Sequence, residues 1–161
     1  MSKLVPFTTT LRVRYTCLCL HTQRAARALA RHFDLAFKPT GLTSGQFSLL
    51  MPLNRPKPPS LGSVATLLAM DRTTLTANLK PLQRRGLIEA EADPSDRRTR
   101  LLRLTPAGRA ALAEAVPIWE RTHAEIEAGL AGGDPDRLRT ELGALALVTR
   151  RPRFLAGPTS E

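Results

Sequence analysis

A turn at residues 93–100, with the sequence DPSDRRTR, places charged side chains between two short apolar runs, LIEA and LLRL. Asp93 and Pro94 are typical of the start of a tight turn, and the serine after them keeps it short and polar. The guanidinium groups of Arg97 and Arg98 follow, and they are suited to bind phosphate groups. The turn therefore predicts a contact with a polyanion.

The charge of the whole chain agrees with such a partner. The formal net charge is +10 and the pI is about 11.1, which indicates either nucleic acid or an acidic membrane surface. Lysine and arginine exceed aspartate and glutamate over residues 1–103, whereas the two nearly balance from residue 104 onward. We therefore expect the first two thirds of the chain to meet the polyanion.

Neither a membrane span nor a signal peptide is predicted. The longest run without charge, residues 39–54, is too short and too polar to cross a bilayer. The N-terminal sequence MSKLVPFTTTLRVR has arginines where a signal peptide needs an apolar core. We expect a cytoplasmic protein without a membrane partner.

The cysteines and histidines do not form a recognisable disulfide or metal-binding motif. Cys17 and Cys19 are too few for a disulfide framework, and an i, i+2 pair on a helix points to different sides. Cys17 and His21 have the i, i+4 spacing of two metal ligands, but neither His32 nor His123 is expected to join them. Because zinc needs three or four convergent ligands, we predict no metal.

Catalytic motifs are not found in the sequence. It has no Gly-rich phosphate loop, no recognisable Ser, His and acid motif, and no paired carboxylates outside the C-terminal helices. A catalytic role for His123 and Glu120, in the run ERTHAEIE, would need a nucleophile or metal that the sequence does not offer. We predict a binding protein without a cofactor, and not an enzyme.

The helices that position the charged turn follow from apolar spacing and capping residues. Residues 12–37 repeat apolar side chains at helical spacing without Gly or Pro, which predicts one long helix that ends at KPTG. Thr43 and Gln46 have capping-box spacing and begin a second helix, which ends at the loop PLNRPKPPS. Ser60 caps a short helix and, after a tight turn, Asp71 caps the next, RTTLTANLKPLQRR.

The second half of the chain predicts a hairpin followed by two helices. LIEAEA and TRLLRL, joined by the charged turn, form the hairpin. Thr105 begins a helix that reaches about residue 130 with a kink at Pro117, and Asp134 begins the last helix, at 135–149. Helix, tight turn, helix and hairpin is the order of a winged helix-turn-helix, so we predict a mainly α fold with a small β-hairpin, of the α+β class.

The helix that follows the tight turn has two different faces. Leu75, Leu79 and Leu82 lie within about 60° of one another on a helical wheel and mark the buried face. The opposite face is polar and then basic, which suits base edges and phosphates in a major groove. It carries Thr73, Thr76, Ala77, Lys80 and Arg84, flanked by Arg72, Thr74 and Asn78. An ordinary solvated face is the alternative, and Pro81 is expected to bend the helix.

Three consecutive motifs make the chain resemble the MarR family of bacterial transcription regulators. They are LAMDRTTLTANLKPLQRRGLI, DPSDRR and LRLTPAGRAAL, and GLTSGQFSLL is similar to the second helix of that family. The resemblance covers about residues 12–150. It implies a homodimeric winged-helix protein on palindromic double-stranded DNA, which dimerises through its first helix and its last two.

The resemblance also implies functions for particular residues. The recognition helix of the family matches residues 72–85, and its wing arginine, held by an aspartate two residues earlier, matches Arg98 behind Asp96, with Arg97 beside it. Ala77 stands where many members carry an arginine, so one common base contact is expected to be missing. The implied division is a dimerisation helix in 1–40, a DNA-binding lobe in 41–104, dimerisation helices in 105–150 and a tail in 151–161.

Members of the family typically sense a small aromatic or phenolic compound, or an oxidant through a cysteine. The resemblance implies an effector pocket between the dimerisation helices and the DNA-binding lobe, lined by Cys19, Gln23, Phe47 and Trp119. We therefore predict a sequence-specific transcription regulator, a repressor or else an activator, whose DNA affinity a small molecule modulates.

Two alternatives remain open. Cys19 aligns with the reactive cysteine of the organic-hydroperoxide-sensing branch, but Gln23 and Phe33 replace the tyrosines that hold the thiolate there, and a packing cysteine is the simpler interpretation. The second alternative is an architectural module that binds nucleic acid by charge alone. Such a module lacks a large affinity ratio for one palindrome over random duplex.

Overall fold

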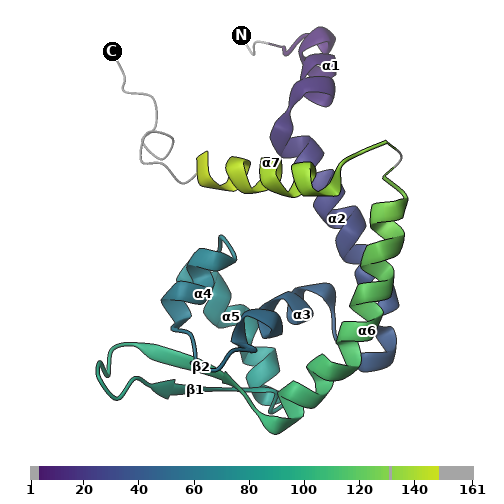
Figure 1. The fold of residues 1–161 in the computed structure, drawn as a ribbon. Helices are drawn as coiled ribbons and strands as arrows, with labels where there is room; N and C mark the ends of the chain where they lie inside the picture. The colour runs from purple at the N-terminus through teal and green to yellow at the C-terminus, as the bar shows by residue number, and fades with distance from the viewer. Residues whose placement is uncertain (1–3, 131, 149–161) are drawn as a thin grey trace, which may run out of the picture.

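The structure, a computed structural model, describes residues 4–130 and 132–148 (Figure 1). Among these residues, no helix has the length and apolar character needed to cross a bilayer. The order of elements confirms the predicted mainly α fold with a two-stranded hairpin. In chain order they are α1 (Phe7–Thr16), α2 (Leu18–Ala36), η1 (Lys38–Thr40), α3 (Ser44–Leu50), η2 (Met51–Leu53), α4 (Leu61–Leu67), α5 (Arg72–Arg84), β1 (Ile88–Ala92), β2 (Arg100–Leu104), α6 (Pro106–Ala128) and α7 (Pro135–Val148).

The single helix predicted over residues 12–37 is wrong, because two helices meet at Cys17. Cys17 has an extended backbone, with φ −76° and ψ 105°, and is the N-cap of α2. Its Sγ accepts the backbone N–H of Leu20 at 3.5 Å, and the Thr16 hydroxyl donates to the Arg12 carbonyl at 2.8 Å. The bond from Leu20 to the sulfur caps α2, and the helix breaks here without glycine or proline.

The capping residues predicted for the central helices are confirmed. Thr43 Oγ1 accepts the Gln46 N–H at 3.2 Å, and the Gln46 side chain accepts the Thr43 N–H in return at 3.2 Å. Asp71 caps α5 by accepting the Thr74 N–H at 2.8 Å. Between α4 and α5, Ala69 has a φ of 53°, which makes the tight turn. The other confirmed caps are Ser60, Thr105 and Asp134.

The hairpin is antiparallel, with a register that runs from the Ile88 and Leu104 pair to the Ala92 and Arg100 pair. The backbone of residues 59–60, which the sequence assigned to a loop and a cap, pairs with the other edge of β2. Both edges of β2 are therefore held, and the hairpin has a fixed position beside α5.

The hydrophobic core lies between residues 37 and 115, in the lobe of α3 to β2 and the first half of α6. Its largest fully buried side chains are Phe37, Leu50, Leu75, Leu82, Leu102 and Val64. Figure 1 shows α1 and α2 as an arm that leaves this lobe, and α6, which packs on α2, continues through Pro117. None of the described residues of α1, α2 or α7 is buried, so these helices leave apolar side chains exposed in a single chain.

Candidate nucleic-acid interface

The face of α5 that points away from the core carries the residues predicted to enter a groove. Leu75, Leu79 and Leu82 are buried on the opposite face, as their spacing predicts. The helix continues through Pro81 to its end. The exposed residues are Arg72, Thr73, Thr74, Thr76, Ala77, Asn78, Lys80 and Arg84.

Two threonine hydroxyls on this face already donate within the protein. Thr74 Oγ1 donates to Asp71 Oδ2 at 2.6 Å, and Thr76 Oγ1 donates to the carbonyl of Arg72 at 2.7 Å. The side-chain bond from Thr74, with its backbone bond, lowers the pKa of the Asp71 carboxyl. Thr74 therefore belongs to the cap of α5, whereas the Thr73 hydroxyl has no hydrogen bond among the described residues.

Two arginines at the ends of α5 lie against other elements, which the sequence did not reveal. The Arg72 guanidinium lies over Gly62 of α4, where an added Cβ would be 3.1 Å from Nη2. Arg85 Nη1 donates to the carbonyl of Gly41 at 3.0 Å and to Gln46 Oε1 at 3.2 Å. Arg85 thus ties the end of α5 to the start of α3, and Gly62 leaves room for Arg72.

Two carboxylates shape the tip of the hairpin, which we call the wing (residues 93–99). Asp93 Oδ1 accepts the N–H and the hydroxyl of Ser95 at 2.8 and 2.6 Å, and the hydroxyl bond is the main cause of the lowered pKa of Asp93. Asp96 Oδ1 accepts the backbone N–H of Arg98 at 3.0 Å, and its Oδ2 accepts the Thr99 hydroxyl at 2.9 Å. The wing backbone is therefore held from both sides.

The sequence predicted that Asp96 holds the side chain of Arg98, but in the structure Asp96 holds the Arg98 backbone instead. Asp96 bonds the backbone N–H of Arg98, and no ion pair engages the Arg98 guanidinium among the described residues. At a separation of two residues, an aspartate carboxylate lies beside that N–H and closes a local turn. Arg97 and Arg98 are both exposed. Arg103 in β2 instead pairs with Glu91 at 2.8 Å, and this hydrogen bond raises the pKa of Arg103.

A cavity of about 460 Å³ lies between α2, α3, α4 and α6. Its wall is apolar and aromatic apart from the hydroxyls of Ser44 and Ser48, and no charged side chain of the described residues lines it. The rings of Phe47 and Trp119 are stacked, with centroids 6.3 Å apart. The lining residues are Phe33, Phe37, Ser44, Phe47, Ser48, Met51, Pro52, Leu67, Leu68 and Trp119.

Cys19 and Gln23, predicted for the same pocket as Phe47 and Trp119, line a different cavity. It has a volume of about 580 Å³ and lies between α2 and α7. The Gln23 side-chain amide donates to Cys19 Sγ at 3.2 Å, and its oxygen accepts from Arg27 Nη2 at 3.0 Å. The structure therefore divides the four predicted pocket residues into two pairs.

The surface made by α5 and the wing is suited to duplex DNA. Small and polar side chains at the start of α5 fit base edges in a major groove, and Lys80 and Arg84 fit phosphates. The arginines of a wing beside the recognition helix can reach the adjacent minor groove. The fold and this surface define a winged helix-turn-helix DNA-binding protein.

Comparison with known proteins gives the family. The model of the MarR family matches residues 42–99, and the chain belongs to the MarR family of transcription regulators, as its motifs predicted. The transcriptional regulator HosA of Escherichia coli O111:H- is 35% identical over 80 residues, which make up 48% of this chain and 59% of HosA.

Solved structures agree. The M. tuberculosis transcriptional regulator MosR, in complex with DNA, has 38% identity and a TM-score of 0.75, and the match covers 83% of this chain and 96% of MosR. BpsR of Bordetella bronchiseptica, whose DNA binding is regulated by 6-hydroxynicotinic acid, has 27% identity and a TM-score of 0.66, with 84% of this chain and 95% of BpsR covered. The protein is a DNA-binding transcription regulator and not an enzyme.

Proposed function

We propose that the protein is a homodimeric repressor that binds a palindromic operator in the bacterial cytoplasm and is released by a small molecule. Each protomer places α5 in a major groove, with the two copies about one helical turn apart, and Arg97 and Arg98 in the flanking minor groove. The observation that carries the proposal is the exposed polar and basic face of α5 beside a wing of fixed backbone. A dimer over a promoter excludes polymerase, which is why we propose repression.

The homodimer is supported by the helices outside the lobe. Phe7 and Leu18 are 72% and 66% exposed, and Leu147 of α7 is 67% exposed. Apolar surface on this scale marks an interface in soluble proteins. We propose that residues 1–40 and 105–150 form the dimer and that residues 41–104 bind the DNA.

A footprint on the DNA that flanks the coding gene, together with light scattering, tests this proposal. We expect a dimer in solution and a protected palindrome whose half-sites are separated by about one helical turn. A stable monomer, or protection without two related half-sites, would contradict it.

We also propose that the aromatic cavity holds the effector. Stacked rings favour a planar aromatic compound, and Ser44 and Ser48 can bond a hydroxyl or carbonyl. The DNA binding of the relative BpsR is regulated by 6-hydroxynicotinic acid, which is planar and aromatic but carries a carboxyl group. Because none of the described lining residues is cationic, we expect uncharged phenols or aromatic amides to bind more tightly than aromatic acids.

Trp119 makes this testable, because it is the one tryptophan of the chain. Phenol and benzoate serve as probes, and a saturable change in tryptophan fluorescence with the first, accompanied by release of DNA, is expected. Ser48→Phe fills the cavity and should abolish the change without loss of DNA binding, whereas Ser48→Ala should retain it. An equal response in the Ser48→Phe variant would place the ligand elsewhere.

A specific contact supports oxidant sensing through Cys19 as a second candidate. The thiol is exposed, and the amide that donates to it is itself bonded to Arg27. The bond from Gln23 fixes the position of an exposed sulfur, which is the atom that a hydroperoxide oxidises. Cumene hydroperoxide should then weaken DNA binding of the parent but not of Cys19→Ser, and Gln23→Leu should react more slowly. A parent that does not respond, or a Cys19→Ser variant that does, leaves Cys19 as a packing residue.

A further inference from the structure

A column of stacked rings leads from the aromatic cavity towards the C-terminal half of α6. Phe37 stacks on Phe47 with centroids 4.8 Å apart, and Phe47 stacks on Trp119. Trp119 in turn stacks on His123, at 4.9 Å and an interplanar angle of 10°. His123 does not line the cavity, but it packs on a ring that does. A change in the position of Trp119 therefore acts on the imidazole.

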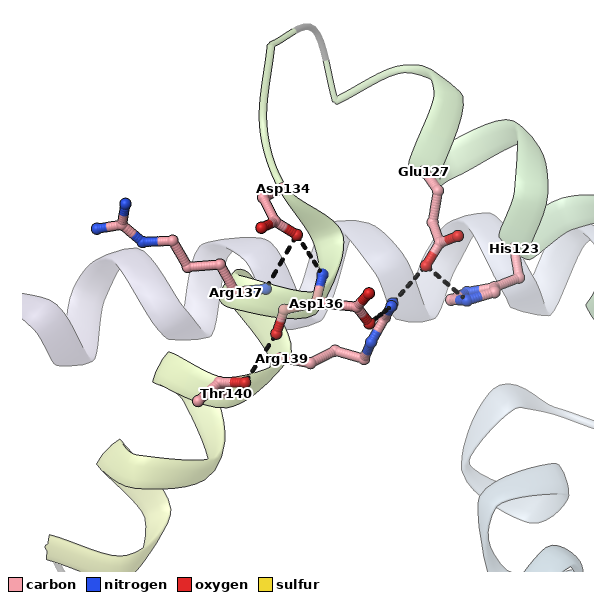
Figure 2. A network of polar contacts seen from close by, with 7 residues as sticks. All are labelled: His123, Glu127, Asp134, Asp136, Arg137, Arg139 and Thr140. Atoms are coloured by element: carbon pink, nitrogen blue, oxygen red, sulfur yellow. Dashed lines mark hydrogen bonds and ion pairs between the residues drawn. The ribbon is translucent and has the colours of Figure 1, made fainter.

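His123 is also the first member of a polar network, which Figure 2 shows. Its Nε2 donates to Glu127 Oε1 at 3.0 Å, and the same oxygen accepts from Arg139 Nη1 of α7. Arg139 Nη2 donates to Asp136 Oδ1 at 2.5 Å. The contacts thus continue without interruption from the wall of the cavity to the first turn of α7.

Hydrogen bonds within the first turn of α7 hold its residues together, so the turn can move as one unit. Asp134 Oδ1 accepts the backbone N–H groups of Asp136 and Arg137 at 3.0 and 3.2 Å. The Thr140 hydroxyl donates to the carbonyl of Asp136 at 2.9 Å (Figure 2). A displacement of Arg139 is therefore expected to move the first turn of α7 as a whole, and not the arginine side chain alone.

The polar network sets two carboxylates against one guanidinium. Arg139 bonds both Glu127 and Asp136, and the Glu127 oxygen that it bonds also accepts the N–H of His123. Glu127 is therefore the group through which the imidazole and α7 are joined.

We propose that His123 is a positioning residue that couples the aromatic cavity to α7, through Trp119 on one side and Glu127 and Arg139 on the other. The proposal rests on the proposed effector site and names the route by which its occupancy reaches a dimerisation helix. A ligand that shifts Trp119 loosens the bond from His123 to Glu127, and with it the hold on α7.

Tryptophan fluorescence of the full-length protein, without effector or DNA, is the first test. Because a side chain stacked on indole alters its emission, we expect the intensity to change in His123→Gln and to stay the same in the matched control His21→Gln. Glu127→Gln and Arg139→Gln weaken the contacts that hold the imidazole on the indole, so each should change the intensity in the same direction. An intensity that is unchanged in His123→Gln, or in both partner variants, would overturn the proposal.

Hydrogen exchange of the α7 backbone amides is the second test, on the same proteins. Exchange should be faster in His123→Leu and in Trp119→Leu, because each removes one contact of the series. Trp119→Phe keeps a ring and should restore slow exchange, as should His123→Gln, which keeps a donor for Glu127. Equal exchange in Trp119→Leu and the parent would show that the cavity wall does not reach α7. Neither readout needs a ligand, so failure to find an effector would leave this result intact.

Discussion

Arg98 combines an exposed guanidinium with a backbone that Asp96 holds in place. The fixed backbone limits the conformational entropy lost when the wing meets DNA, although the side chain itself is still free. The wing is therefore a positioned loop that carries two exposed cations. Such an arrangement suits phosphates and a narrow minor groove of varying width better than one fixed base contact.

Arg98→Ala should weaken operator binding and reduce the slope of log K against log salt by about 1, because one phosphate or groove contact is lost. The unfolding midpoint should not change, since no fold contact of the guanidinium is removed. Fluorescence anisotropy across a salt series measures both effects. Arg137→Ala, an exposed arginine of α7 paired with Glu141, is the control, and equal slopes for the two variants would rule out this role of the wing.

For single residues, contacts between close neighbours in the sequence could be predicted, whereas contacts between residues far apart in the sequence could not. Thr43, Gln46 and Asp71 cap helices through residues three positions away, so their spacing carries the information. Arg85, by contrast, bonds residues that precede it by 44 and 39 positions. No pattern in one sequence reports such a contact, because it depends on how the helices pack.

The N-cap of α5 links the stability of that helix to pH. The bonds from Thr74 place the pKa of Asp71 in the folded protein below its ordinary value of 3.8. The carboxylate therefore stabilises the fold above that value, and this contribution is lost as the pH falls through the lower, folded pKa.

Urea unfolding of the parent and of Asp71→Asn between pH 5 and 2 should show this directly. The parent should lose stability more steeply on acidification, because asparagine can cap but does not titrate. Parallel curves for the two proteins would mean that the Asp71 charge adds nothing to the cap.

The start of α6 is packed directly on the backbone where α5 meets β1. A Cβ at Gly108 would lie 1.9 Å from the carbonyl oxygen of Leu87. Gly108→Ala should therefore destabilise the fold by about 1–3 kcal/mol or more, as overpacking does. Gly45→Ala is the matched control, since its Cβ would meet Thr43 Oγ1 at an ordinary 3.9 Å. If both variants unfold at the same urea concentration, α6 does not pack on the lobe as described.

Element types were largely predictable, because apolar spacing and caps define them. The break at Cys17 was not, since neither glycine nor proline marks it and the cap uses a sulfur atom. The two cavities were also beyond sequence reasoning. Cys19 lies on α2 and Phe47 on α3. The cavity at Phe47 is covered by α6, whereas the cavity at Cys19 is covered by α7.

On the scale of the whole molecule, the lobe that carries the basic surface also holds the buried core, whereas the outer helices expose apolar side chains. The core ends near residue 115, and none of the described residues of α1, α2 and α7 is buried in a single chain. We propose a partner copy that covers the outer helices and duplex DNA that binds the lobe. The family resemblance implied the partner copy, and the uneven charge predicted the polyanion.

The surface of α5 and the wing is proposed to recognise a specific DNA sequence, and a competition measurement tests this most directly. Affinity for the palindrome beside the coding gene is compared with that for a shuffled duplex of equal length at physiological salt. We expect a ratio of about 10³ or more, lost when Thr73 and Asn78 are both replaced by alanine. Equal affinity for the two duplexes would contradict the account and indicate a module that binds DNA by charge alone.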